Sequence, residues 1–212
     1  MIAKLLLPIP VLIYAACCLI AMDVEFNRNS IANLLGSGRL MAQSTHAAHA
    51  TMLDCDRLMN GRLYQYFIKG RFAQERDACL AEAEAILRSR PTQGYAWYVK
   101  ALSLGFAGQR AEAEASTFRS QAVSQHEGWL AARRVRVYLD LVGFENVSAS
   151  PRFWSDVEEG LKFRSSRRWL SGAYLKYPQF RSQFDEILKR AQRSHQRAFF
   201  VQVDLLLAGS GS

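Results

Sequence analysis

The sequence predicts an all-α protein: an N-terminal transmembrane helix followed by a right-handed stack of helical hairpins. Residues 5–22 form an apolar run without charge, long enough to cross a bilayer. Apolar residues then recur at intervals of three or four, as in Trp97, Ala101 and Leu104, so that they share one face of a helix. Gly108 separates two such runs and suits the left-handed residue that often ends a helix.

The N-terminal run reads LLLPIPVLIYAACCLIAM from Leu5 to Met22. As a helix it is about 27 Å long, close to the hydrocarbon thickness of a bilayer. Lys4 precedes it, and Asp23 and Glu25 follow it. This asymmetry places the N-terminus in the cytoplasm and the rest outside. We therefore expect residues 1–22 to be a signal anchor of a single-pass protein in the bacterial inner membrane, with a periplasmic C-terminal domain.

Two alternatives for this segment stay open. A basic start and an apolar run also fit a cleaved signal peptide, although no small-x-small cleavage site precedes Asp23. Cys17 or Cys18 could be lipidated, but Tyr14 stands three residues before Cys17, where a lipobox usually has an aliphatic residue.

A juxtamembrane segment and linker are expected over 23–44, with Gly36-Ser37-Gly38 as a hinge. Residues 45–142 are expected to hold the helical repeats. In the first, Asn60 to Arg90, residues 70–72 are the predicted turn, and the second helix is predicted over 73–90.

The central unit, Gly94 to Glu127, carries the strongest pattern. Its first helix has Trp97, Ala101 and Leu104, its turn has Gly108, and its second helix has small residues such as Ala113. This unit resembles a tetratricopeptide repeat (TPR), a helical hairpin of 34 residues. An ordinary Ala-rich helical bundle is the alternative.

The resemblance implies that the concave surface, lined by the first helix of each hairpin, binds a peptide or a partner helix. The residues expected there are Tyr64, Tyr66, Tyr95, Tyr98, Val99, Leu102 and Ser103.

A further helix is predicted over 128–142, and a C-terminal basic helical region over 143–208 is expected to cap the stack. Ser150-Pro151 is a typical helix start. The last run, Ala198 to Leu207, is the natural helix to cover the open end. Residues 209–212 are expected to form a tail.

The net charge of +8 and the pI near 9.6 favour an anionic partner or surface. From 151 to 200 eleven Lys and Arg stand against five acids. A solvated helical surface is the plainer interpretation of this excess. The residues expected to contact an anionic partner are Arg133, Arg134, Arg136, Arg164, Arg167 and Arg168. The predicted compartment argues against nucleic acid.

Cys55 and Cys79 are the cysteines outside the apolar run. An extracytoplasmic domain permits a disulfide. In a plain hairpin, however, Cys79 would face about residue 62, leaving Cys55 about 10 Å further along the helix, beyond the reach of a disulfide. A break at Asn60-Gly61 could bring Cys55 back, but two free thiols are the expected state.

No catalytic constellation is present: there is no glycine-rich phosphate loop, GxSxG, HExxH or CxxC. We expect no catalytic residue, no cofactor and no metal. The sequence thus predicts a membrane-anchored extracytoplasmic scaffold that binds a protein partner, either a membrane or a periplasmic subunit, in a cell-envelope assembly such as polysaccharide biosynthesis or export. The alternative is a helical domain that binds or processes an acidic envelope polysaccharide.

Overall fold

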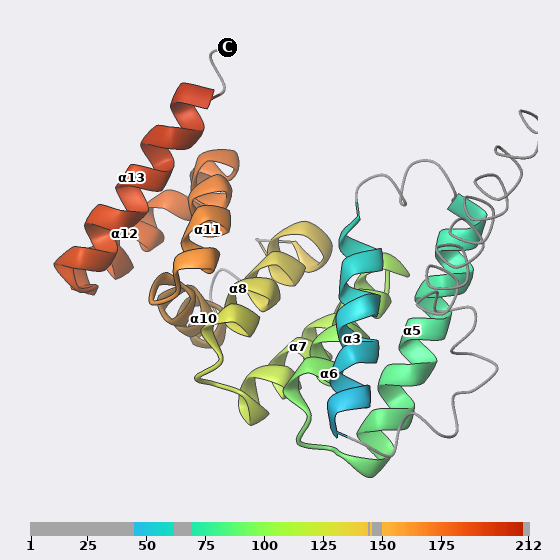
Figure 1. The fold of residues 1–212 in the computed structure, drawn as a ribbon. Coiled ribbons are helices and arrows are strands. Elements are labelled where there is room, and N and C mark those ends of the chain that lie inside the picture. Colours follow the sequence, from blue (N-terminus) through green and yellow to red (C-terminus); the bar gives the residue numbers. More distant parts are fainter. Residues whose placement is uncertain (1–44, 62–68, 144, 146–149, 210–212) are drawn as a thin grey trace, which may run out of the picture.

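The computed structural model describes residues 45–61, 69–143, 145 and 150–209, and within these ranges the chain is helical, without any strand (Figure 1). The all-α prediction is confirmed for this part. The predicted transmembrane helix, the linker over 23–44 and residues 210–212 lie outside the described residues. Of the helices that are described, none combines the length and the hydropathy needed to span a membrane.

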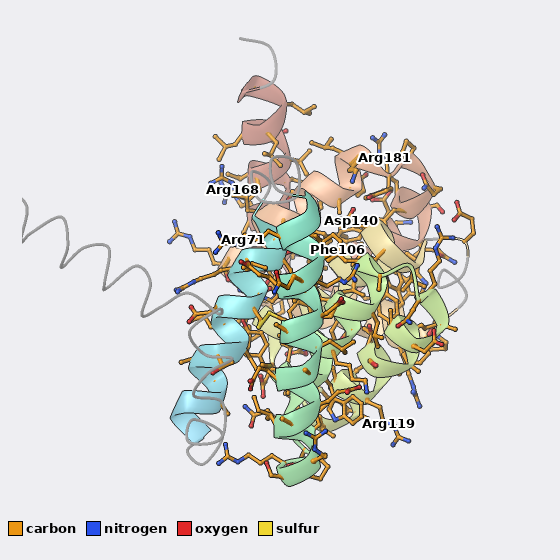
Figure 2. All side chains as sticks on the ribbon, turned by 90° about the vertical axis from the view of Figure 1, so that its right-hand side faces the viewer. Arg71, Phe106, Arg119, Asp140, Arg168 and Arg181 are labelled. Carbon is orange, nitrogen blue, oxygen red and sulfur yellow. A yellow bond between two sulfur atoms is a disulfide. The ribbon has the colours of Figure 1, made fainter. Side chains whose placement is uncertain are left out.

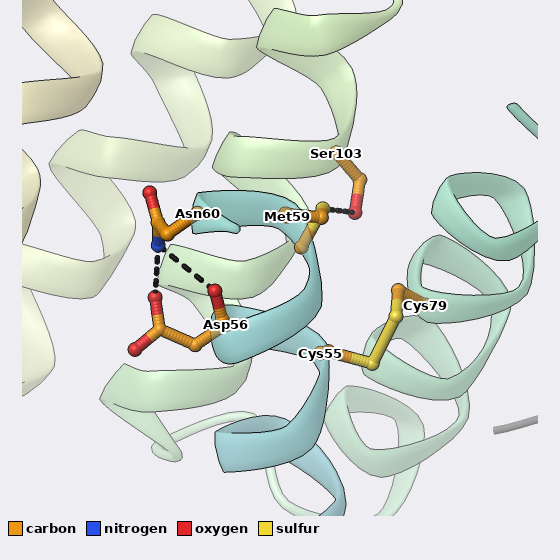
Figure 3. The surroundings of a disulfide bond; sticks show 6 residues. All are labelled: Cys55, Asp56, Met59, Asn60, Cys79 and Ser103. Atoms are coloured by element: carbon orange, nitrogen blue, oxygen red, sulfur yellow. Dashed lines mark hydrogen bonds between the residues drawn. A yellow bond between two sulfur atoms is a disulfide. The ribbon is translucent and has the colours of Figure 1, made fainter. Parts of the chain in front are cut away.

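The first helical pair consists of α3 (Thr45–Asn60) and α5 (Lys69–Ser89). Residues 70–72, predicted to form a turn, instead lie in the first turn of α5, where Arg71 pairs with Glu75 at 2.9 Å. A disulfide joins Cys55 to Cys79, with the two Cα atoms 5.7 Å apart (Figure 3). The expectation of two free thiols is therefore wrong. That expectation assumed a plain hairpin in which Cys79 faces about residue 62. In the structure α3 ends at Asn60, and this break changes which residues of the two helices lie opposite each other.

The central hairpin is formed by α6 (Gly94–Phe106) and α7 (Arg110–Val123), close to the predicted boundaries. Gly108 in the connecting turn has φ +80°, the left-handed conformation that was expected of it. Ala101 and Ala113 are both fully buried, as small residues between two close helices should be.

The next helix runs continuously from α8 (Gly128–Val137) into a π-helical turn (η1, Tyr138–Val142), and Gly143, with φ +102°, follows it. A Cβ at Gly128, where α8 starts, would stand 1.8 Å from the ring of Phe163, so a larger residue there would force that ring to move. Val135 and Leu139 lie in the core, whereas Trp129 is only partly buried.

The C-terminal region contains α10 (Pro151–Leu161), α11 (Arg164–Lys176), a 3-10 turn (η2, Pro178–Phe180), α12 (Arg181–Arg190) and α13 (Arg193–Gly209). Pro151 opens α10 as predicted, although the Ser150 side chain makes no capping hydrogen bond. Gly209, placed in the tail by the sequence, is the last residue of α13.

Figure 1 shows the helices in chain order, from α3 and α5 at one end, through α6, α7 and α8, to α11, α12 and α13 at the other. Buried side chains from all of these helices form one continuous core. Within it, Arg134 of α8 and Asp156 of α10 form a bidentate ion pair at 2.6 and 2.8 Å, and their side chains are 0% and 1% exposed. Arg134 also donates to Ser124 Oγ at 3.2 Å, so this pair ties the end of α7 to α8 and α10.

Candidate binding groove

The face of α6 that was expected to be the open concave surface is covered by α3. Tyr95, Tyr98, Val99, Leu102 and Ser103 are all at most 3% exposed. Their expected exposure is therefore corrected, and they are core residues in this structure. The physical reason is the apolar face of α3, formed by Ala48, Met52, Cys55 and Met59, which is buried as well. Figure 3 shows Ser103 donating to Met59 Sδ, at 3.4 Å. Tyr64 and Tyr66 lie outside the described residues.

Asp56 is the polar centre of this contact. It is 3% exposed and accepts hydrogen bonds from the hydroxyls of Tyr95, at 2.9 Å, and Tyr98, at 2.8 Å. Asn60 Nδ2, one turn further along α3, donates to the same carboxylate (Figure 3). Arg133 Nε, from α8, donates to Asp56 Oδ2 at 2.8 Å. The carboxylate therefore joins α3, α6 and α8.

The network changes the acid-base properties of its members. Burial raises the pKa of Tyr95 and of Tyr98 well above the ordinary phenol value, and the negative charge of Asp56 raises both further. Burial alone would lower the pKa of Arg133, but the charge of Asp56 and its hydrogen bond raise it overall. At neutral pH the two phenols are therefore protonated donors and the guanidinium is charged.

A groove begins beside this network at the C-terminal end of α3 and is lined by residues along α8 and α11. One part, of about 370 Å³, is lined by Asp56, Arg57, Asn60, Tyr98, Trp129, Ala132, Arg133, Arg136, Ser165, Ser166 and Trp169. A second part, of about 550 Å³, adds Asp140, Arg168, Gly172, Ala173, Lys176, Tyr177 and Leu206. The two parts share Asn60, Arg136, Ser165 and Trp169, so we treat them as one surface and call it the α8–α11 groove.

The charge of the α8–α11 groove is strongly positive. Five cationic side chains (Arg57, Arg133, Arg136, Arg168 and Lys176) line it, against two acids, Asp56 and Asp140. Both acids already have partners. Asp140 pairs with Lys176 at 3.0 Å and Arg136 at 3.3 Å and accepts from the Tyr177 hydroxyl at 2.5 Å. The groove lining thus carries an excess of three positive charges, although Arg57 also pairs at 3.5 Å with Asp54, which lies outside the lining.

Asp140 stays ionised in this setting. Its burial alone would raise the pKa of the carboxyl, but the hydrogen bonds from Tyr177 and Lys176 and the nearby positive charges lower it overall. It therefore fixes Lys176 and Tyr177 on one wall of the groove. Arg168, which Figure 2 labels together with Asp140, is exposed and forms no ion pair with any described residue.

Two indole rings complete the groove. Trp129 and Trp169 are partly buried at the edge of the core and line the groove with their remaining surface. The guanidinium of Arg133 lies 5.1 Å from the centre of the Trp129 ring, a cation–π contact. The groove is therefore basic and aromatic, a combination that suits recognition of an anionic segment with some apolar surface.

The six arginines predicted to contact an anionic partner separate into different environments. Arg134 is buried in the ion pair with Asp156, so its expected role is corrected: it lies in the core. Arg133, Arg136 and Arg168 line the groove, the first two already paired with acids. Arg164 and Arg167 belong to a separate pocket between α11 and α13.

Several groove residues were not predicted from the sequence. Arg57 and Lys176 contribute to the general basic excess but were not singled out as ligand-binding residues, and neither were Trp129 and Trp169. Asp56 carried no signal, because an isolated Asp in an amphipathic helix is ordinarily solvated. Only contacts over long sequence separations, such as the 77 residues between Asp56 and Arg133, bring these side chains together.

The described ranges hold no group of three or more His, Cys, Asp or Glu residues placed to bind a metal ion. His49 instead packs against the rings of Tyr95 and Trp129, at 5.2 and 6.3 Å between centroids. Comparison with known proteins gives no match to a family model, to a curated protein or to a solved structure.

Proposed function

We propose that the chain is a membrane-anchored scaffold whose helical domain lies outside the cytoplasm and binds an acidic segment of a protein partner in a bacterial cell-envelope assembly. The observation that carries this proposal is the α8–α11 groove, with its excess of three positive charges and its two indole rings. A machine for polysaccharide biosynthesis or export is the assembly we favour.

Two observations support the compartment. The uncharged run over 5–22 fits a signal anchor in the inner membrane, with the domain in the periplasm. The disulfide between Cys55 and Cys79 fits an oxidising compartment, because disulfides seldom persist in the cytosol.

The TPR-like architecture is part of the proposal. It is supported by the α6–α7 hairpin, with the left-handed Gly108 at its turn and Ala101 and Ala113 buried in the pair. In a TPR the first helices line an open concave face. Here α3 covers that face on α6, so the proposed binding surface moves to α8 and α11, the helices that α3 leaves open.

An acidic peptide segment fits the groove for two physical reasons. Carboxylates can accept from Arg168 and from the remaining N–H donors of Arg133 and Arg136, since each guanidinium has five. Apolar side chains of the same segment can pack on Trp129 and Trp169, which lose their remaining water contact on binding. Both interactions require the groove to be accessible, and Ser165, which lines both of its parts, is exposed.

Site-specific photocrosslinking tests the proposal. A photoreactive residue at Ser165, in the full chain in native membranes, should give an adduct with one protein, identifiable by mass spectrometry. The same residue at Ala115, exposed on α7 and outside the groove, is the matched control. Charge reversal by Arg168→Glu with Lys176→Glu should abolish the Ser165 adduct, whereas Arg119→Glu on α7 should not. Equal adducts from Ser165 and Ala115 would refute the groove as the binding surface.

An acidic polysaccharide is the second candidate ligand, because uronate carboxylates and sugar faces would use the same cationic and indole groups. Binding of the purified chain to polyglucuronate, steeply weakened by salt and by Arg168→Glu, together with no protein adduct at Ser165, would favour this reading.

A further inference from the structure

A second basic pocket lies between α11 and α13, apart from the α8–α11 groove. It has a volume of about 570 Å³ and is lined by Arg164, Arg167, Arg193, Ser194, Arg197, Ala198, Val201 and Gln202. No acidic side chain of the described residues lines it. Four guanidinium groups thus surround one pocket without a carboxylate to balance them.

These arginines are largely unpaired with other protein groups. Arg164, Arg193 and Arg197 form no ion pair with a described residue. Arg167 is held in place by its Nη1, which donates to the carbonyls of Leu161 at 2.9 Å and Lys162 at 3.2 Å at the end of α10. Its other N–H donors remain for a ligand, because a guanidinium has five.

The backbone adds to the positive potential. Arg164 and Arg193 are the first residues of α11 and α13, and neither helix has an acid in its first turn. The two helices run side by side in the same direction, as three successive contacts show. Arg164 and Arg197 both line the pocket. Further along, Ser171 Oγ donates to the Phe199 carbonyl, and near the other end Ala173 and Leu206 line the same part of the α8–α11 groove. The N-terminal ends of both helices, which carry partial positive charge, therefore lie at the pocket. This charge repels the arginine side chains and would be compensated by a bound anion.

An apolar strip leads out of the pocket along α13. Val201, which lines the pocket, is 47% exposed, and Leu205, one turn further, is 60% exposed. Arg197, Val201 and Leu205 are four residues apart along α13, so the charged and the apolar side chains lie on one face of the helix.

We propose that this pocket binds the phosphate group of an amphiphilic phosphate ester, with the apolar part of the ligand lying along Val201 and Leu205. Phosphate matches four guanidinium groups better than a carboxylate does. A phosphate carries up to two negative charges and three acceptor oxygens, and arginine binds it with two parallel hydrogen bonds. A single carboxylate would leave three of the four cations unbalanced. The phosphate could belong to a free anion or to a lipid headgroup. The exposed Val201 and Leu205 favour the lipid, because its acyl chain can pack on them.

The test uses the full chain in a neutral detergent and measures binding by calorimetry. Three probes separate the possibilities: inorganic pyrophosphate, a short-chain phosphatidic acid, and a short-chain phosphatidylcholine, whose headgroup has no net charge. Pyrophosphate and phosphatidic acid should both bind, phosphatidic acid more tightly, and phosphatidylcholine should not bind.

Variants assign the binding to the pocket. The double substitution Arg193→Gln with Arg197→Gln should weaken both phosphate probes by about tenfold or more, because it removes two of the four charges that would hold the phosphate. Both residues are exposed, so the fold should be kept, which circular dichroism checks. The matched control, Arg110→Gln with Arg119→Gln on α7, removes the same charge at exposed sites elsewhere and should leave affinity unchanged.

Leu205→Ser tests whether the apolar part of the ligand contacts α13. It should weaken the binding of phosphatidic acid several-fold and leave the binding of pyrophosphate unaffected. If Leu205→Ser changes neither affinity and both probes bind alike, the lipid assignment is overturned and a free phosphate remains as the ligand. Equal weakening by the α7 control pair, or binding of phosphatidylcholine as tight as that of phosphatidic acid, would overturn the site altogether. The Ser165 crosslink does not depend on these outcomes, so a failure here is distinct from a failure of the proposed function.

Discussion

Asp56 of α3 and Arg133 of α8 form an ion pair at 2.8 Å, although 77 residues separate them in the chain. The carboxylate also accepts from the hydroxyls of Tyr95 and Tyr98, so it fixes α3 on α6 and directs Arg133 to the wall of the groove. The Asp56 side chain thus helps to hold α3 over the expected concave face of α6, and it also positions Arg133 in the α8–α11 groove.

Asp56→Ala should lower the free energy of unfolding by about 2–3 kcal/mol, because it leaves two buried phenol donors without an acceptor. The lost ion pair with Arg133 adds less to this free-energy change, because the Arg133 side chain is 37% exposed and water can solvate its guanidinium. Urea denaturation measures the change. Asp54→Ala, which removes a half-buried acid 3.5 Å from the exposed Arg57, should cost less than about 0.5 kcal/mol. Equal effects of the two substitutions would contradict the assigned role of Asp56.

Reduction of the Cys55–Cys79 disulfide should lower the melting temperature. The bond closes a loop with a sequence separation of 24, which corresponds to roughly 3–4 kcal/mol of stabilisation by restriction of the unfolded chain. Thermal unfolding with and without reductant measures the loss. Cys55→Ser should melt at the reduced temperature in both conditions. Quantitative alkylation of both thiols in unreduced protein, found by peptide mass spectrometry, would show that the bond is absent.

Arg134→Ala should be severely destabilising, by about 3–5 kcal/mol, because it leaves Asp156 as a buried carboxylate without its cation. Replacing both partners by apolar residues, Arg134→Met with Asp156→Leu, should restore most of this stability. Lys189→Ala, at the exposed pair with Glu186, should leave the unfolding midpoint unchanged and serves as the control. If Arg134→Ala is harmless to stability but weakens binding of an anionic partner, the sequence-based assignment of Arg134 is restored.

Alkaline pH should unfold the domain before its buried tyrosines ionise. Burial raises the pKa of Tyr95, Tyr98 and Tyr138 in the folded state. The folded protein therefore keeps these protons at a pH where the unfolded chain loses them, and stability falls as pH rises above about 10. Tyrosinate absorbance should show these phenols titrating only together with the loss of helical circular dichroism. Full titration near the ordinary pKa with the helices intact would contradict their burial.

Ala101→Trp and Ser103→Trp should both unfold or strongly destabilise the domain. The sequence suggested that Ser103 faces outward, but both residues are at most 1% exposed, and added volume in a packed core costs about 1–3 kcal/mol or more. Ala115→Trp, exposed on α7, should be tolerated. Melting temperatures compare the three variants. A mild effect of Ser103→Trp would mean that α3 does not cover α6 in solution.

The local sequence predicted most of the helices and the turn at Gly108, although it wrongly placed a turn at residues 70–72. Spacings of three and four, Gly108 at φ +80° and Pro151 at a helix start predicted the central hairpin and α10 to within a few residues, because helical periodicity and turn preferences act over one or two turns of chain. The basic excess that favours an anionic partner was also visible.

The tertiary structure decided which surface is open. The sequence suggested a break at Asn60-Gly61 only as an alternative. It could not show that α3 is bonded to Cys79 and lies over Tyr95, Tyr98 and Ser103, because an apolar helical face fits any partner of similar shape. Nor could it separate the buried Arg134 from the exposed Arg168, since an arginine's environment depends on whether an acid such as Asp156, 22 residues away, packs against it.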